Sequence, residues 1–218
     1  MSRVLTSGWP GPRIRLALAT FGILALELAV IRWLSSQVRL MAYFNNLVLI
    51  AAFLGMGLGV ALGRRKPELY RWLFPTLLLF AVIAGTAEVT GLSRLVFPDP
   101  GVHLWGAEQA TDLFTFTWVF GLLLGLFWLV VAIFLFAGTA VGHYFGASDT
   151  LDSYSWDLLG SLLGVVAFAL LTAAGTPPLA WFLLGCLPLL FLAPKPGHVA
   201  MVGLVLVVVR YSEGDALF

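Results

Sequence analysis

The amino-acid sequence predicts an all-α fold: a polytopic transmembrane bundle of about seven helices, forming one domain over residues 1–218. Three observations predict it. Hydrophobic residues make up 61% of the chain and charged residues 11%, against about 45–50% and about 25% in soluble domains. The apolar residues are gathered into runs of roughly membrane length, and Lys and Arg lie mainly between alternate runs. This composition excludes an ordinary water-soluble surface.

Each apolar run is expected to be a helix, because lipid leaves no hydrogen-bond partner for an open backbone. About 20 apolar residues cross the hydrocarbon core. The expected spans are 16–36, 43–63, 72–92, 113–145, 154–175, 177–193 and 198–210. The fourth is too long for one level crossing and is expected to tilt or project. The seventh would reach only about 18 Å, so it is predicted as a short span, an arm of a re-entrant hairpin or a helix cut off by the end of the chain. Residues 194–197 (PKPG) predict a tight turn before it.

Basic residues predict the orientation, because short cytoplasmic loops carry an excess of Lys and Arg. With a cytoplasmic N-terminus, eight basic residues lie inside: Arg3, Arg13, Arg15, Arg64, Arg65, Lys66, Arg71 and Lys195. Three lie outside: Arg39, Arg94 and Arg210. Residues 93–112 are then expected to form an outer loop with a short amphipathic element.

Partners and cofactors are constrained by what the sequence contains. The net charge is +1, with no basic stripe of the kind that binds nucleic acid, so the lipid bilayer is the expected surrounding. A single cysteine, Cys186, and three histidines on separate segments predict no disulfide, no metal site and no cofactor. Glycines at four-residue spacing predict close helix packing, within the bundle, with a partner protein or in a homo-oligomer. They are Gly55, Gly59, Gly63; Gly121, Gly125; Gly138, Gly142, Gly146; Gly160 and Gly164.

Charged residues within the spans are the candidate ligand-binding or inter-helix polar sites. Glu27 falls near the middle of the first span, where a lone ion is costly and has to pair, become neutral or line a wet cavity. Arg32 lies about 140° around the same helix, so the two are poorly placed to pair. We expect Arg32 to meet Glu88 or the pair Asn45 and Asn46. An inter-helix clamp, a ligand or ion site, and simple snorkelling are the three open interpretations.

Asp157 is expected to open the fifth span near the inner face, close in sequence to Asp149, Asp152, His143 and Tyr144. An acidic residue in a first turn favours the helix dipole, and Asp152 or Ser153 could serve as the N-cap. A cation-binding inner patch is the alternative.

Three segments resemble the membrane region of spermidine-synthase-like proteins, sometimes called fused transporter/spermidine synthases. Residues 26–34 (LELAVIRWL) are similar to that family's first helix. Residues 53–65 are similar to its glycine-rich second helix and basic loop, which resemble half of a major-facilitator transporter. Residues 154–164 and 175–178 are similar to its fifth helix and the turn that follows. The resemblance implies a multi-pass protein of the bacterial inner membrane and a polyamine-related setting. It also implies a soluble aminopropyltransferase-like domain after the helices, which this 218-residue chain does not contain, so no catalytic residue is carried over.

Two functions follow as hypotheses, and no nucleophile–base constellation supports an enzyme on this chain alone. The first is a non-enzymatic membrane module that anchors or docks a partner or an appended domain. The alternative is a small transporter-like bundle that binds a polar or cationic ligand near Glu27 and Arg32. A wet cavity around Glu27 would favour transport, whereas a dry and fully paired Glu27 would favour the anchor.

Overall fold

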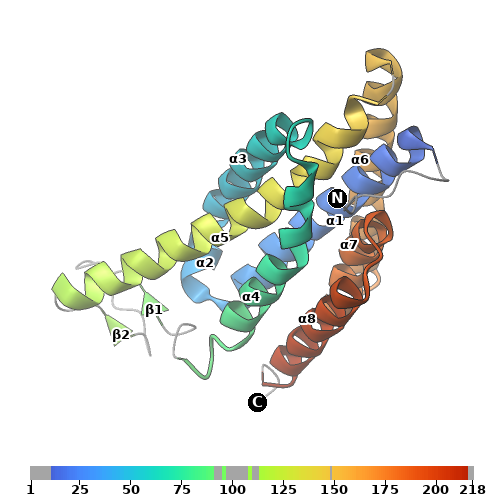
Figure 1. Ribbon diagram of the computed structural model, residues 1–218. Coiled ribbons are helices and arrows are strands. Elements are labelled where there is room, and N and C mark those ends of the chain that lie inside the picture. Colours follow the sequence, from blue (N-terminus) through green and yellow to red (C-terminus); the bar gives the residue numbers. More distant parts are fainter. Residues whose placement is uncertain (1–10, 91–94, 97–107, 110–112, 148, 216–218) are drawn as a thin grey trace.

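The computed structural model describes residues 11–90, 95–96, 108–109, 113–147 and 149–215 (Figure 1). Within these residues the chain is almost entirely helical. Seven longer helices are α1 (Pro12–Gln37), α3 (Asn45–Gly63), α4 (Leu73–Gly85), α5 (Leu113–Phe145), α6 (Thr150–Ala173), α7 (Pro178–Leu192) and α8 (Pro196–Asp215). Shorter elements are α2 (Arg39–Tyr43), the 3-10 helix η1 (Pro67–Trp72) and a parallel pair of two-residue strands, β1 (Leu95–Val96) and β2 (Glu108–Gln109).

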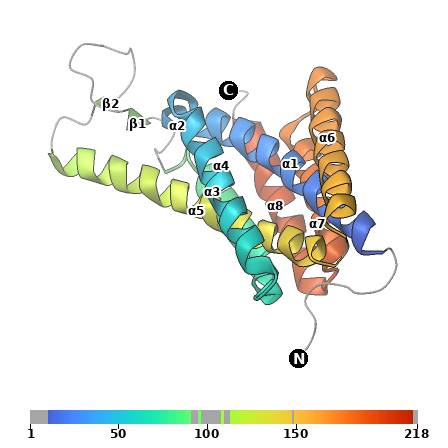
Figure 2. The ribbon, with the colours of Figure 1, turned by 90° about the horizontal axis from the view of Figure 1, so that it is seen from above.

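The first helix, α1, runs through the middle of the bundle (Figure 2). Its contacts are mainly with α6 and α7, and it also packs on α5. The core around its second half is aromatic: the ring centroid of Trp33 lies 5.2 Å from that of Phe182 in α7 and 5.9 Å from that of Phe80 in α4, both in edge-to-face geometry. A helix that is apolar all round has to be covered on several sides, and α1 is covered in this way by its neighbours.

Contacts between the other helices fix their relative directions. The backbone of Gly55 faces Val131 and that of Gly63 faces Gly142, so α3 and α5 run parallel. In α8, the ring of His198 lies 5.0 Å from that of Phe74, near the start of α4. A Cβ on Gly85, at the end of α4, would lie 2.7 Å from Val208. The helices α4 and α8 therefore also run parallel, and the seven longer helices alternate in direction along the chain.

This alternation gathers the basic residues at one end of the bundle, here called the basic end: Arg13, Arg15, Arg64, Arg65, Lys66, Arg71 and Lys195. They belong to the start of α1, the connection from α3 to α4, and the turn between α7 and α8. The opposite end carries Arg32, Arg39 and Arg210.

The interface of α3 and α5 is a contact between backbones. A Cβ placed on Gly59 would overlap the carbonyl oxygen of Leu135, and one placed on Gly138 would lie 2.8 Å from the carbonyl oxygen of Met56. Gly121 and Gly125 differ, because no heavy atom lies within 4 Å of the Cβ positions of either. The packing expected at these two glycines is therefore not found within the described residues.

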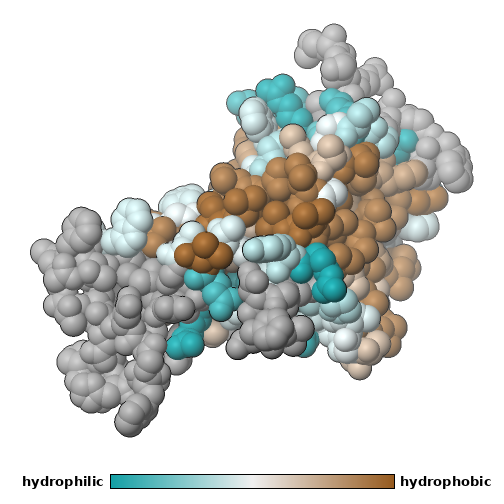
Figure 3. Space-filling view, turned by 90° about the horizontal axis from the view of Figure 1, so that it is seen from below, coloured by the Kyte–Doolittle hydropathy of each residue, from teal (hydrophilic) through white to brown (hydrophobic). Residues whose placement is uncertain are grey.

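The outer surface is apolar over a broad band, with hydrophilic residues above and below it in the view of Figure 3. In the part of the chain that the structure describes, five helical stretches are long and apolar enough to cross a membrane, and α7 and the apolar part of α8 are shorter. The most exposed of these helices is α6, in which 17% of the most apolar stretch is buried. Its Leu162 and Leu170 are 60% and 66% exposed. Apolar side chains exposed to this extent are compatible with a multi-pass membrane protein.

Several predicted boundaries require correction. The third span ends at Gly85 rather than at residue 92, because the chain enters a series of turns at Thr86. The second span begins as a separate short helix, α2, and the fifth begins at Thr150 rather than at residue 154. The turn predicted at residues 194–197 is partly wrong, since Pro196 starts α8, a position that suits proline. With 20 residues, α8 is about 30 Å long, so the predicted reach of about 18 Å was too short. Most of the predicted outer loop, 93–112, lies outside the described residues.

Candidate functional site

Glu27 is an ionisable residue in the interior of the bundle, near the middle of α1. Its side chain is 2% exposed. The Oε2 atom of its carboxyl group has no hydrogen-bond partner among the described residues. A buried carboxylate without a partner is strongly disfavoured. Glu27 is therefore a candidate functional group because it is buried and Oε2 has no partner among the described residues. It is not the paired inter-helix clamp that one interpretation of the sequence expected.

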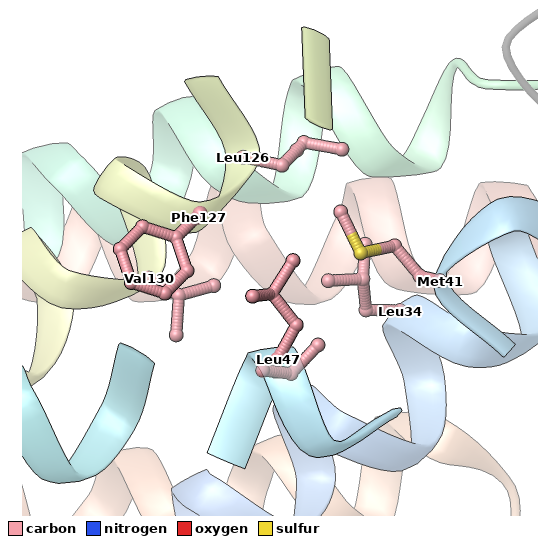
Figure 4. A pocket seen from close by; sticks show the side chains of 7 residues that line it. Leu34, Met41, Leu47, Leu126, Phe127 and Val130 are labelled. Atoms are coloured by element: carbon pink, nitrogen blue, oxygen red, sulfur yellow. The ribbon is translucent and has the colours of Figure 1, made fainter. Parts of the chain in front are cut away.

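The direction in which Glu27 faces follows from its helical neighbours. Ile23, Val30 and Leu34 lie four, three and seven residues away, so they share a face of α1 with Glu27. Leu34 lines a small apolar gap between α1, α2, α3 and α5, together with Met41, Leu47, Val48, Leu126, Phe127 and Val130 (Figure 4). This gap leaves no room for a water molecule. The face that carries Glu27 is therefore apolar and dry at the level of Leu34, and seven residues before Glu27 the hydroxyl of Thr20 contacts the backbone of α6.

Arg32 lies on a different face of α1 from Glu27. Its guanidinium carbon is 4.7 Å from the centroid of the Trp181 ring in α7, and the indole Nε1 of Trp181 donates a hydrogen bond of 3.1 Å to the hydroxyl of Thr176. Arg32 and Glu88 are both exposed and form no salt bridge with each other, so that expected pairing is wrong. Helix rotation turns the arginine toward α7, where an aromatic face takes the place of the expected carboxylate.

The other candidates at this end do not converge on Arg32 or Glu27. Glu88 follows the end of α4 in a turn, outside any helix. Asn46 is exposed in the first turn of α3. The side chain of Asn45 lies outside what the structure describes, so its proposed contact with Arg32 stays a prediction.

Asp157 does not open its helix, because α6 begins at Thr150 and places this residue in the third turn. The N-cap is Asp149, without a side-chain hydrogen bond, so the capping role predicted for Asp152 or Ser153 is wrong. The backbone carbonyl of Asp157 instead accepts a hydrogen bond of 3.2 Å from the hydroxyl of Thr20. Asp157 therefore takes part in joining α6 to α1 through its main chain.

Two polar contacts at the basic end pair residues that sequence spacing could not pair. Arg13 forms a salt bridge with Asp152, which joins the first turn of α1 to that of α6. Arg15 is 3% exposed, and its guanidinium carbon lies 6.0 Å from the ring centroid of Tyr144 in α5. The sequence indicated that these residues could meet only through their predicted placement on the same side of the membrane.

The described residues contain no group of three or more His, Cys, Asp or Glu side chains able to hold a metal ion. Cys186 is buried in α7. What remains within this part of the chain is a single buried carboxyl group that can hold a proton or meet one charged group. No family model, no curated protein and no solved structure matches the chain.

Proposed function

We propose that the protein is an integral membrane module in which all seven longer helices cross the bilayer with a cytoplasmic N-terminus, and which anchors or docks a partner protein. One observation carries the orientation: among the described residues, the alternation of the helices brings seven basic residues to the basic end, against three at the opposite end. A surplus of Lys and Arg on the cytoplasmic side is the usual determinant of orientation.

The anchoring role draws on how the bundle is packed. The α3–α5 interface brings backbones together, the arrangement that stabilises helix pairs in lipid, where no hydrophobic drive exists between helices. The gap beside Leu34 is dry. The sequence resemblance to the membrane region of spermidine-synthase-like proteins is consistent with an anchor, and a bacterial inner membrane would be its setting.

Reporter fusions test the orientation. A fluorescent protein that folds only in the cytoplasm is joined after Lys66 and after Lys195, and a phosphatase active only outside is joined after Thr176 and after Asp215. We expect activity at all four positions. A fluorescent protein that stays dark after Lys66, or an inactive phosphatase after Asp215, would contradict the proposed seven crossings.

A second candidate function is a small transporter-like bundle that binds a polar or cationic ligand. The observation that favours it is Glu27, which is 2% exposed and whose Oε2 atom has no partner among the described residues. Ionisable groups within membrane spans commonly belong to substrate or ion pathways.

The Glu27→Gln substitution separates the two functions. If the variant folds and assembles normally but loses solute uptake in proteoliposomes, the transporter is supported. If only folding or partner assembly is lost, the anchor is supported. Glu88→Gln serves as the control, because Glu88 is exposed and lies in a turn outside the helices.

A further inference from the structure

We propose that Glu27 is a proton-binding site, held as the neutral carboxylic acid at neutral pH and reactive toward hydrophobic carbodiimides. This inference rests on the proposed insertion of α1 in the membrane, but not on whether the module anchors a partner or moves a solute. The first ground is the placement of Glu27, whose carboxyl group is 2% exposed with Oε2 unpartnered among the described residues.

The second ground is the position of the charged groups around it. On α1, Arg15 lies twelve residues away, about 18 Å along the helix axis, and Arg32 faces the ring of Trp181 instead. The titratable or charged residues on the helices that pack against α1 are Arg39 in α2, His143 and Tyr144 in α5, Asp152, Tyr154 and Asp157 in α6, and Cys186 in α7. The described side chains of α3 and α4 include none. Neither Arg39 nor His143 forms a salt bridge with Glu27, so among the described residues no cation pairs with a negative charge at this position.

A proton fits the site better than a metal ion or an organic cation. Hard metal cations take about six oxygen ligands, whereas the residues that share the face of Glu27 are the apolar Ile23, Val30 and Leu34, together with Thr20. The nearest hydroxyl on α1 toward its N-terminus, that of Thr20, already contacts the carbonyls of Leu16 and Asp157. An organic cation would need a cavity, and the gap on this face of α1, seven residues from Glu27 at Leu34, has no room for a water molecule. A proton needs only one carboxyl oxygen.

Carbodiimide chemistry reports this state directly. The acid proton of Glu27 moves to a nitrogen of the carbodiimide, and the carboxylate oxygen then bonds to the central carbon to give an O-acylisourea. The acyl group next shifts from oxygen to nitrogen, and a stable N-acylurea remains on the side chain. No oxidant, reductant or leaving group takes part. The reaction requires a protonated carboxyl group. Because Glu27 is 2% exposed, labelling takes place during local opening of the helices, when an apolar reagent enters from the lipid.

The full chain in detergent or liposomes is treated with dicyclohexylcarbodiimide at neutral pH and digested with trypsin. The peptide 16–32 carries Glu27 as its only side-chain carboxyl group, and the peptide 72–94 carries only Glu88, the internal control. An exposed glutamate titrates near pH 4.3, so only about 0.2% of it is protonated at pH 7. We expect the peptide 16–32 to be labelled at least about tenfold more than the peptide 72–94, and the label to be lost in Glu27→Gln.

Infrared spectroscopy supplies a second measurement that does not depend on the variant folding. We expect a protonated carboxylic acid carbonyl band at neutral pH that decreases when wild-type protein reacts with the carbodiimide. Absence of this band, or a band unchanged by labelling, overturns the proposal. Carbonate extraction tests membrane insertion separately: a protein that remains in the membrane but lacks the band contradicts the proton site alone.

Discussion

The hydroxyl of Tyr70 donates a hydrogen bond of 2.7 Å to the backbone carbonyl of Leu189. Tyr70 belongs to η1 and is fully buried, while Leu189 lies in the last turn of α7. The last four carbonyls of a helix have no partner within that helix. The ring of His198 extends this pattern, because its Nδ1 lies 2.8 Å from the carbonyl oxygen of Ala193. One side chain distant in sequence, Tyr70, and one from the start of the next helix, His198, thus contact carbonyls at the carboxyl end of α7.

Removing the Tyr70 hydroxyl should destabilise the bundle without opening a large cavity. Tyr70→Phe keeps the ring but leaves the carbonyl of Leu189 buried without that donor, and an unsatisfied buried polar group costs about 1–3 kcal/mol. Thermal unfolding in detergent should show a lower midpoint. The matched control is Tyr154→Phe, since Tyr154 is 58% exposed and its hydroxyl faces the surroundings of α6. Equal midpoints for the two variants would exclude a capping role for Tyr70.

Substitution by alanine should lower stability at one glycine of α3 and preserve it at another. Gly59→Ala places a methyl group on the carbonyl oxygen of Leu135, whereas Gly57→Ala meets no heavy atom within 4 Å. Overpacking costs about 1–3 kcal/mol, but alanine in an exposed helix position gains up to about 1 kcal/mol over glycine. We expect Gly59→Ala to lower the yield of monodisperse protein and its unfolding midpoint, and Gly57→Ala to preserve both. If Gly59→Ala proves harmless, the backbones of α3 and α5 are not in contact.

The contact between Arg32 and Trp181 should contribute modestly to stability. Cation–π pairs at exposed sites are worth about 0.5–1 kcal/mol, so Arg32→Gln should lower the free energy of unfolding by that amount, and Arg32→Lys by less. A double-mutant cycle with Trp181→Leu should show the coupling. The parallel cycle of Arg32→Gln with Glu88→Gln should show none, because these side chains form no salt bridge. Coupling between Arg32 and Glu88 would restore the pairing expected from the sequence.

The position of a residue in the sequence predicted how deep it lies along its helix better than it predicted which side chain it contacts. Glu27 was expected in the middle of the first span, and it lies deep within α1. Arg32 was placed near the correct end but with the wrong partner, because its direction depends on how α1 is rotated against α7. Asp157 was expected at the start of its helix because the apolar run begins later than the helix does. Residues 150–153 are helical as well, and hydropathy does not indicate this.

The ends of α4 and α8 also differ from what the hydrophobicity of the sequence indicates. Apolar residues continue past Gly85, yet α4 ends there, and polar residues continue α8 to Asp215. Hydrophobicity marks which residues tolerate lipid, but the end of a helix is set by local hydrogen bonds and by packing against neighbours.

The sequence by itself determined that the chain forms long apolar helices with basic residues between alternate pairs, since composition and run length are properties of the chain alone. Only the tertiary structure decided that Glu27 Oε2 lacks a hydrogen-bond partner among the described residues, that Arg32 lies on Trp181 and that Tyr70 caps α7. The physical reason is that a contact between helices depends on the rotation of each helix about its axis and on its depth beside its neighbour. Both quantities are fixed by packing between segments far apart in the sequence, such as the glycine contacts of α3 with α5.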